Sequence, residues 1–281
     1  MIARWVSGGR LATGLSFDDR AWQYGDGLFE TIAVRDGEPR LLDWHLERLA
    51  IGCTRLGLQE PPRGIIESDL VMALDVADVD TSFALVKLVV SAGRGPRGYQ
   101  RRTTGTQAFL AAFGSDPIAP DLYLSGVRVR LCKTRLARQP QLAGIKTLNR
   151  LEQVLARSEW SDNSWFEGLT FDTAGMLICG TMSNVFVVRD NSIVTPDLSQ
   201  AGVAGIMRRQ VIEIAHLNGI AVSVQDISRD ELEPVDEVFL CNSQMGVVPV
   251  GDLDGRSLAV GMMTRTLMGL LADDGLGKPK C

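Results

Sequence analysis

The sequence is short of lysine and histidine. Histidine occurs only at His45 and His216, which argues against a histidine-based triad or a histidine-rich metal site. Arginine supplies most of the positive charge, and two of the five lysines lie in the C-terminal tail. Chemistry that needs a lysine must therefore use Lys87, Lys133 or Lys146.

Long apolar runs, paired cysteines and a basic surface are also missing. The formal net charge is −5, which argues against a nucleic-acid or anionic-membrane surface. No uninterrupted apolar run approaches the roughly 20 residues of a membrane span, since the segment 83–90 carries Lys87, and residues 1–14 lack the apolar core of a signal peptide. The five cysteines are scattered, with no metal-ligand spacing. We therefore expect a cytoplasmic globular protein with no metal site.

The mixed order of strand and helix patterns predicts an α+β fold with two domains. The polar segment 114–121 contains Pro117 and Pro120 and is the predicted linker between domains 1–113 and 122–281. The elements expected in the first domain are a hairpin at 31–42 around Asp36–Gly37, a helix from about Asp43 that buries Leu46, Leu49, Cys53 and Leu56, and strands at 82–93 and 107–113. The elements expected in the second are a strand at 126–133, a helix directly after Lys146, a helix at 205–219, two strands within 236–250 and a helix at 257–272 followed by a frayed end.

Lys146 has an unusual position in the segment LAGIKTLNRLEQVLAR (142–157). Leu148, Leu151 and Leu155 repeat at helical spacing, so the lysine would stand at a helix start, where the helix dipole disfavours a cation. Partial desolvation by the neighbouring apolar side chains would favour the neutral, nucleophilic amine. The alternative is a lysine that extends its amine into solvent.

Three further segments offer sites for an anion. In AGVAGIMR (201–208) two glycines precede a helix, so amides near Gly205, Ile206 and Met207 would suit a phosphate, although such glycines are often only a turn. The turn at Asn242–Ser243 could donate hydrogen bonds or simply cap itself. GRGPRG (93–98) nominally matches a dinucleotide motif, but no helix follows it. It is either a loop that presents Arg97 and Tyr99 to an anion or a solvated loop.

These segments resemble a known family when they are taken in order. YGDGLFET, HLERL, GRGPRGY, LAGIKTLNRLEQVLAR, MSNVF, AGVAGIMR and CNSQMGVVPV are similar to the motifs of fold type IV pyridoxal-phosphate enzymes, the family of branched-chain and D-amino-acid aminotransferases. The resemblance covers nearly the whole chain and implies a two-domain fold like that of D-amino-acid aminotransferase.

The resemblance also implies the cofactor, pyridoxal 5'-phosphate, and a role for each site residue. Lys146 would attach the cofactor and act as the catalytic base, and Thr31 would act beside it. Arg48, which by itself suggests only a surface ion pair with Glu47 or Asp43, would bind the cofactor phosphate. The other implied cofactor residues are Cys179, Ser183, Asn184, Gly205, Ile206, Met207, Asn242 and Ser243. The implied substrate residues are Tyr24, Arg97 and Tyr99, and the implied assembly is a homodimer that acts on a small molecule.

Within this family, the segments around Lys146 and Tyr99 are most similar to the aminodeoxychorismate lyases. This likeness implies conversion of 4-amino-4-deoxychorismate to 4-aminobenzoate and pyruvate for folate synthesis. An aminotransferase of the branched-chain or D-amino-acid type is the alternative, and a non-catalytic binder of the cofactor or of a metabolite is a further one.

Cys179 departs from the family pattern. Members usually carry a glutamate at this place, five residues before Asn184, and that glutamate keeps the pyridine nitrogen of the cofactor protonated. A thiol is a weak partner for this purpose, because its unperturbed pKa is about 8.5. The departure favours a lyase over a transaminase, since elimination is also driven by formation of an aromatic ring.

Overall fold

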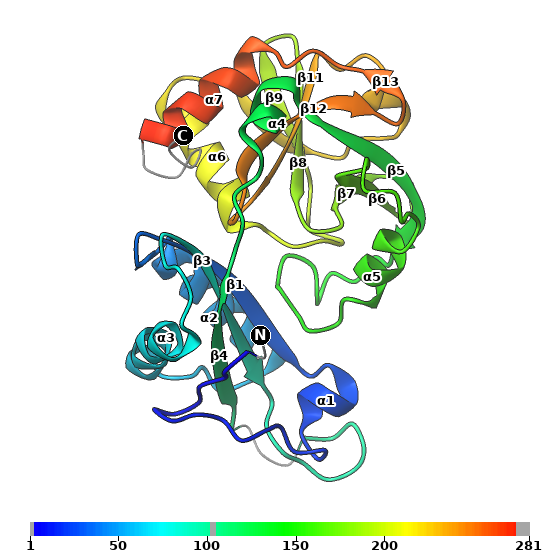
Figure 1. Ribbon diagram of the computed structural model, residues 1–281. Coiled ribbons are helices and arrows are strands. Elements are labelled where there is room, and N and C mark those ends of the chain that lie inside the picture. The colour runs from blue at the N-terminus through cyan, green and yellow to red at the C-terminus, as the bar shows by residue number, and fades with distance from the viewer. Residues whose placement is uncertain (1–2, 102–104, 274–281) are drawn as a thin grey trace. The chain divides into compact units, whose positions relative to one another are not determined.

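The structure is a computed structural model that describes residues 3–101 and 105–273 of the chain. It divides into two compact units (Figure 1). Unit 1 comprises Met1–Asp116 with Ile145–Asn149, and unit 2 comprises Pro117–Gly144 with Arg150–Cys281. Each unit contains both helices and a β-sheet, which confirms the expected α+β class. No helix in the described ranges is long and apolar enough to cross a bilayer.

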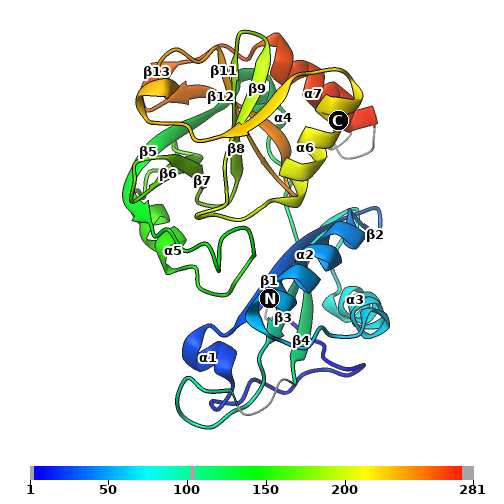
Figure 2. The same cartoon turned by 180° about the vertical axis from the view of Figure 1, so that it is seen from behind.

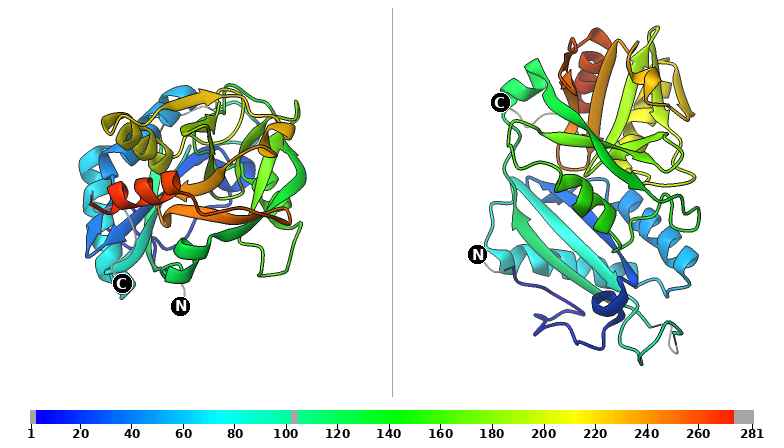
Figure 3. Two further views of the ribbon diagram at one scale, coloured as in Figure 1. Left: turned by 90° about the horizontal axis from the view of Figure 1, so that it is seen from above. Right: turned by 90° about the vertical axis from the view of Figure 1, so that its right-hand side faces the viewer.

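Unit 1 is an antiparallel four-stranded sheet with two helices on one face (Figures 1 and 3). The strand order is β2-β1-β3-β4, so β3 is internal, as its largely apolar sequence predicts. Its elements are α1 (Arg20–Tyr24), β1 (Gly27–Arg35), β2 (Glu38–Pro39), α2 (Leu42–Leu56), α3 (Arg63–Ala77), β3 (Phe83–Ser91) and β4 (Gln107–Gly114).

The hairpin and the first long helix follow local sequence signals. Asp36 and Gly37 both have positive φ, 52° and 83°, as a two-residue hairpin turn requires. Helix α2 begins at Leu42, one residue before the expected start, and Leu41 precedes it in a left-handed conformation. Asp43 lies in the first turn, where its charge complements the helix dipole.

The core of unit 1 lies between the sheet and helices α2 and α3. Leu28 and Ile32 of β1 are buried against it, and α2 contributes Leu46, Leu49 and Cys53 as expected. The fourth predicted core residue of α2, Leu56, is only partly buried.

Unit 2 is built on a nine-stranded mixed sheet, in which β13 pairs with β12 beside the order β10-β9-β8-β11-β12-β5-β6-β7. Helices α6 and α7 pack against a core formed by these strands (Figure 2). Its elements are α4 (Pro120–Ser125), β5 (Val127–Leu136), α5 (Leu151–Arg157), β6 (Glu167–Asp172), β7 (Leu177–Gly180), β8 (Asn184–Arg189), β9 (Ser192–Pro196), α6 (Ile206–Leu217), β10 (Val222–Gln225), a 3-10 turn (Asp230–Leu232), β11 (Glu237–Asn242), β12 (Gly246–Leu253), β13 (Arg256–Ser257) and α7 (Met262–Asp273).

The position of Lys146 differs from the expectation. The chain passes from unit 1 to unit 2 after Asp116, within the segment predicted as a linker, but Ile145–Asn149 returns to unit 1. The amide of Phe29 donates to the carbonyl oxygen of Lys146 at 2.9 Å, and that of Leu148 donates to Gly27 at 3.0 Å. Lys146 therefore lies on an extended segment that pairs with β1 of unit 1, not at a helix start in the second domain.

The helix that follows Lys146 begins only at Leu151. Leu151 and Leu155 are 77% and 61% exposed, so the helical spacing of the leucines marks an outward face of α5 and not a buried one. The last helix likewise begins at Met262 and not at 257, because Ser257 belongs to β13. The frayed end expected beyond it, 274–281, lies outside the described residues.

Candidate active site

Strand β1 sends alternate side chains to the two faces of the unit 1 sheet. Leu28 and Ile32 enter the core, and Glu30 lies between them on the same face. Phe29 and Thr31 occupy the opposite face. The strand therefore offers one charged group toward α2 and two half-buried groups on the other side.

Glu30 is the centre of a buried charge cluster with two residues of α2. Its carboxylate accepts a hydrogen bond from Arg48 Nε at 2.8 Å on Oε1, and a second from Arg48 Nη2 on Oε2. His45 Nδ1 lies 2.6 Å from Oε2. Glu30 and His45 are each 1% exposed, so solvent contributes little to balancing the charge of Glu30. The bidentate ion pair fixes the plane of the Arg48 guanidinium, the predicted phosphate ligand.

The cluster contains one carboxylate, one guanidinium and a neutral imidazole. Burial lowers the pKa of His45, and the positive charges of Arg48 and Lys146 lower it further, although Glu30 opposes the shift. Burial acts to raise the pKa of Glu30, but Arg48 and His45 outweigh it and bring that pKa to about 2. At neutral pH the His45 N–H therefore donates to an ionised Glu30, and the Glu30–Arg48 pair carries no net charge.

The Glu30→Gln variant should flatten the dependence of stability on pH. Glu30 has a folded pKa of about 2, below its model value of 4.5, so its stabilisation is present above about pH 4.5 and is lost as pH falls toward 2. The depressed pKa corresponds to about 3 kcal/mol as an order of magnitude. Urea unfolding from about pH 6 to about pH 3 measures this slope, and an equal slope in variant and wild type would contradict the role given to Glu30.

Two lysines share one aromatic ring on the other face of the sheet. Lys146 Nζ lies 4.4 Å from the centroid of the Phe29 ring, and Lys87 Nζ lies 5.5 Å from it. Lys87 stands directly opposite Thr31 in the β1–β3 ladder. No carboxylate in residues 3–101 or 105–273 lies within ion-pair distance of Lys87, although its side chain is half-buried. Two cations beside one ring create a site for a negatively charged group.

Sequence reasoning did not single out Lys87 as a site residue. It was counted among the three lysines available for chemistry and as evidence against a membrane span, but it was given no role in the site. The register that sets it beside Thr31 and near Lys146 comes from strand pairing, but the scarcity of lysine was an available signal.

In unit 2, the β7–β8 turn and the start of α6 meet through Asn184. Its side chain donates to the carbonyl oxygen of Val203 at 3.0 Å. A Cβ on Gly205 would lie 1.9 Å from Asn184 Oδ1, so this close approach requires glycine. Gly205 carries no capping side chain, and the first amides of α6, those of Ile206 and Met207, stand at the positive end of the helix.

The Asn242–Ser243 turn is joined to the same region. Asn242 Nδ2 donates to the carbonyl oxygen of Met182 at 3.2 Å, and Asn242 Oδ1 accepts from the amides of Gln244 and Met245. Unit 2 thus brings the predicted residues Ser183, Asn184, Gly205 and the Asn242–Ser243 turn close to one another. The self-capping expected as an alternative is present as well.

Glu167 anchors the turn that carries Ser183. This fully buried carboxylate accepts hydrogen bonds from the amides of Thr181 and Met182 and from the hydroxyls of Thr181 and Ser183. Sequence reasoning missed Glu167, which no motif in the sequence singles out. It holds the 180–183 turn rigid beside Asn184.

Cys179 lies on β7 in an apolar setting. It is 7% exposed and clusters with Leu136, Ile178, Leu198 and Ala201. The Thr170 hydroxyl donates to the Cys179 carbonyl oxygen at 2.8 Å and lies 3.6 Å from its sulfur.

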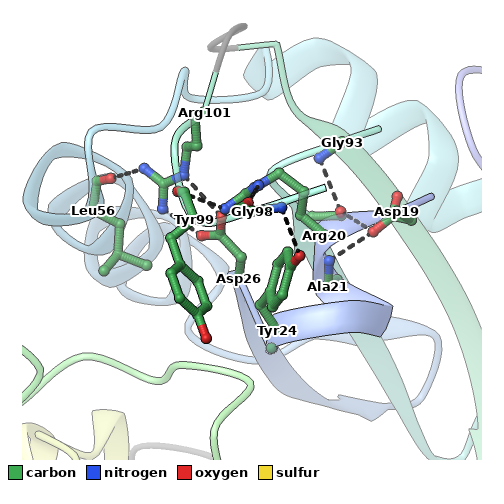
Figure 4. A network of polar contacts seen from close by, with 12 residues as sticks. Asp19, Arg20, Ala21, Tyr24, Asp26, Leu56, Gly93, Gly98, Tyr99 and Arg101 are labelled. Carbon is green, nitrogen blue, oxygen red and sulfur yellow. Dashed lines mark hydrogen bonds and ion pairs between the residues drawn. The ribbon is translucent and has the colours of Figure 1, made fainter. Parts of the chain in front are cut away.

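The remaining predicted residues lie in unit 1. Tyr24 ends α1, and its ring meets that of Tyr99 edge to face at a centroid distance of 5.5 Å (Figure 4). Tyr99 is 87% exposed, and Arg97 is exposed on the same β3–β4 loop. The next element that the structure describes after this loop is strand β4 and not a helix, so the dinucleotide motif is excluded. Unit 1 thus holds Tyr24, Thr31, Arg48, Arg97, Tyr99 and Lys146, and unit 2 holds the other eight predicted residues.

Comparison with known proteins gives consistent matches along the whole chain. Residues 27–253 match the amino-transferase class IV family. The chain is 35% identical over 276 residues to an aminodeoxychorismate lyase of Vibrio harveyi, covering 95% of this chain and 98% of the relative. It is similar, with a TM-score of 0.90 and 43% identity, to the crystal structure of 4-amino-4-deoxychorismate lyase from Pseudomonas aeruginosa, covering 96% and 98% of the two chains. A hypothetical aminotransferase from Mycobacterium tuberculosis in its PLP-bound form has the same fold, with a TM-score of 0.82, 22% identity and coverage of 98% and 99%.

Proposed function

Because the chain belongs to the class IV aminotransferase family, we propose that it is a pyridoxal-phosphate-dependent lyase that converts 4-amino-4-deoxychorismate to 4-aminobenzoate and pyruvate. The observation that carries this choice is likeness over nearly the full chain to two aminodeoxychorismate lyases, at 35% and 43% identity. Its substrate is accordingly a small anionic molecule.

Each unit, taken by itself, holds donors that suit a part of pyridoxal 5'-phosphate: Lys146 and Arg48 lie in unit 1, and the other donors lie in unit 2. Lys146 supplies the amine that attaches it. Arg48, held flat by Glu30, supplies a cation for the phosphate, and the amides of Ile206 and Met207 with the Ser243 hydroxyl supply neutral donors. The Ser183–Asn184 segment and Cys179 would line the ring. When bound, the cofactor supplies an electron sink next to the substrate's amine.

The residues of unit 1 supply the proton transfers and the substrate contacts. Lys146 removes the proton from the ring carbon that carries the amine, and Lys146 or a water returns a proton to the departing enolpyruvate. Thr31 and Lys87, adjacent in the ladder, offer a hydroxyl and a cation for a substrate carboxylate. Arg97, Tyr99 and Tyr24 offer a second cation and two hydroxyls for the other carboxylate.

Cys179 separates the lyase from the runner-up, an aminotransferase. Its thiol lies 3.6 Å from the Thr170 hydroxyl and interacts electrostatically with the half-buried Arg150, so it offers little stabilisation to a protonated pyridine nitrogen. A transaminase depends strongly on that proton, whereas formation of an aromatic product helps the elimination. We therefore expect any transamination by this enzyme to be slow.

A product assay tests the proposal. Purified protein loaded with pyridoxal phosphate should form 4-aminobenzoate and pyruvate from aminodeoxychorismate. It should form keto acid from D-alanine or a branched-chain amino acid with 2-oxoglutarate at a rate lower by at least about 100-fold. Keto-acid formation faster than 4-aminobenzoate formation would identify an aminotransferase. The absence of product in both assays would favour the non-catalytic binder.

The Lys87→Met variant should raise KM for aminodeoxychorismate by roughly 10- to 100-fold, because one charged contact to a carboxylate is lost. Methionine preserves the length and the apolar stem of lysine, so the sheet should stay intact. Steady-state kinetics with the cofactor spectrum as a check give the result. An unchanged KM would remove Lys87 from the substrate site.

We also propose a cytoplasmic homodimer. The apolar face of α5, formed by Leu151, Val154 and Leu155, is more than half exposed in the single chain, as a subunit interface would be. The four described cysteines are buried free thiols, which suits a reducing compartment. Sedimentation that gives a monomer with bound cofactor would overturn the dimer.

A further inference from the structure

One buried polar network joins α1 to the β3–β4 loop in unit 1 (Figure 4). Its centre is Asp26, which stands between α1 and β1. Asp26 Oδ2 accepts hydrogen bonds from Arg20 Nε at 2.8 Å and Arg101 Nε at 2.9 Å, and Oδ1 accepts from Arg101 Nη2. The side chains of Asp26 and Arg20 are 10% and 5% exposed, so these ion pairs are shielded from water.

Arg20 uses its other nitrogens on the loop backbone. Nη1 donates to the carbonyl oxygen of Gly98 at 2.9 Å, and Nη2 donates to that of Tyr99 at 3.0 Å. The Gly98 amide donates to the Tyr24 hydroxyl at 3.1 Å, and the Arg20 guanidinium lies 5.0 Å from the centroid of the Tyr24 ring. The backbone on the C-terminal side of Arg97 is therefore held at three polar groups, the amide and carbonyl of Gly98 and the carbonyl of Tyr99.

The N-terminal end of the loop is held separately. The Gly93 amide donates to Ser91 Oγ at 2.9 Å, and the Ser91 hydroxyl donates to Asp19. The Arg20 amide donates to the Gly93 carbonyl oxygen at 3.0 Å. Both ends of the loop are thus tied to α1 and its cap.

The arginines of this region divide into two kinds. Arg20 and Arg101 are committed to Asp26 and to backbone carbonyls, including that of Leu56. Arg97 is exposed, and within the described residues its side chain has no hydrogen-bond or ion-pair partner. Of these three, Arg97 is the one whose charge is available to a ligand.

We propose that Asp26 is a positioning residue which, through Arg20 and Arg101, fixes residues 97–99 in the conformation that receives a substrate carboxylate. The inference rests on the lyase activity proposed above. A loop already ordered in the free enzyme loses less conformational entropy on binding, so the clasp formed by Asp26, Arg20 and Arg101 lowers KM. It touches neither cofactor nor reacting atoms, so it leaves the chemical step unchanged.

The Asp26→Asn variant tests the clasp by kinetics. It keeps the shape of the side chain and removes the charge that holds both guanidiniums. We expect KM to rise about tenfold or more, with kcat changed less than about threefold and the cofactor absorbance retained. The matched control is Asp80→Asn, an exposed acid of unit 1 that accepts only from its own turn, the Ser82 amide at 2.9 Å, and it should leave KM unchanged. Equal effects on kcat and KM, or loss of cofactor, would overturn a positioning role.

The rate of trypsin cleavage after Arg97 measures how well the loop is ordered, and it requires no assay of the reaction. Native Asp26→Asn holoenzyme should be cut there at least about tenfold faster than wild type, while Asp80→Asn should match wild type.

Arg101→Met is a second variant that tests the clasp if Asp26→Asn folds poorly, because Arg101 is more peripheral. Arg101→Lys should give a smaller effect. The Asp26→Asn/Arg101→Met double variant should be no worse than the stronger single one. If all the clasp variants are cut after Arg97 at the wild-type rate, the inference is refuted. If the wild-type protein is inactive on aminodeoxychorismate but its loop is protected from trypsin, only the proposed function is refuted.

The protection of the Arg97 loop from trypsin should also persist into mild acid. Burial acts to raise the pKa of Asp26, but hydrogen bonds and charges from Arg101 and Arg20 outweigh it and lower that pKa. A depressed folded pKa keeps the contribution of the clasp present above the unfolded value of about 3.9, and it is lost only as pH falls through the folded pKa. Cleavage rates, corrected for trypsin activity, should stay level from about pH 8 to about pH 5, and a steep rise within that range would contradict the assigned geometry.

Discussion

The Lys146→Ala enzyme should form 4-aminobenzoate more than about 10³-fold more slowly than wild type. In the proposed function Lys146 both attaches the cofactor and moves the substrate proton, and each general acid–base step contributes roughly 10² to 10⁴-fold. The carbonyl oxygen of residue 146 accepts from the Phe29 amide, and alanine keeps that atom, so the pairing with β1 should survive. Single-turnover kinetics separate loss of chemistry from loss of substrate binding.

Chemical labelling ties this loss to one amine. Borohydride reduction of the holoenzyme should fix the cofactor on Lys146, as mass spectrometry of the peptides would show. Lys133→Ala is the matched control, because Lys133 is exposed on β5 and takes no part in the proposed site. Label on Lys87 or Lys133 in the wild type would show that the catalytic lysine is misassigned.

The second large effect is expected from Arg48→Met, which should weaken both the cofactor site and the fold. Removing the guanidinium leaves Glu30 as an uncompensated carboxylate in a fully buried place, a change that typically costs 3–5 kcal/mol. Loss of a charged contact to the phosphate should weaken cofactor binding by roughly 10- to 100-fold. Urea unfolding of the apoprotein and cofactor titration measure the two effects separately.

A double variant distinguishes these two roles of Arg48. Glu30→Gln/Arg48→Met removes both charges, so the free energy of unfolding should recover most of what Arg48→Met loses. Cofactor affinity should stay low, because the phosphate still lacks its cation. If affinity returns together with stability, Arg48 is only a structural partner of Glu30.

Local sequence patterns predicted most of those helices and strands that bury one face against the core. The Asp36–Gly37 hairpin, the buried stripe of α2 and helix α6 followed from turn chemistry and periodicity. The prediction of a helix directly after Lys146 was wrong. The spacing of the leucines could not show whether their face of the helix is buried or exposed, because both kinds of face have the same period. Helix α3 and the short α1 were not predicted.

The candidate site could be outlined from sequence through residue patterns and motif resemblance. Residue patterns singled out Lys146 and the α6 start as candidates, and the resemblance added Arg48 and the roles of all three, but neither gave an account of what holds them. Glu30 and His45 are fifteen residues apart, and their contact depends on how α2 packs on β1. Lys87 meets Thr31 through strand register, and Arg101 meets Asp26 across 75 residues. Such long-range pairings are fixed by tertiary packing and carry no local signal.

The return of Ile145–Asn149 to β1 has a consequence for how the protein is made. Until residue 148 has left the ribosome, the Gly27–Phe29 edge of β1 lacks its partner strand and exposes unpaired backbone groups. A fragment ending at Asp116 would keep that edge open permanently and should associate edge to edge. Synthesis of the second unit therefore completes the first, and Lys146, the proposed catalytic lysine, lies on the segment that pairs with this edge.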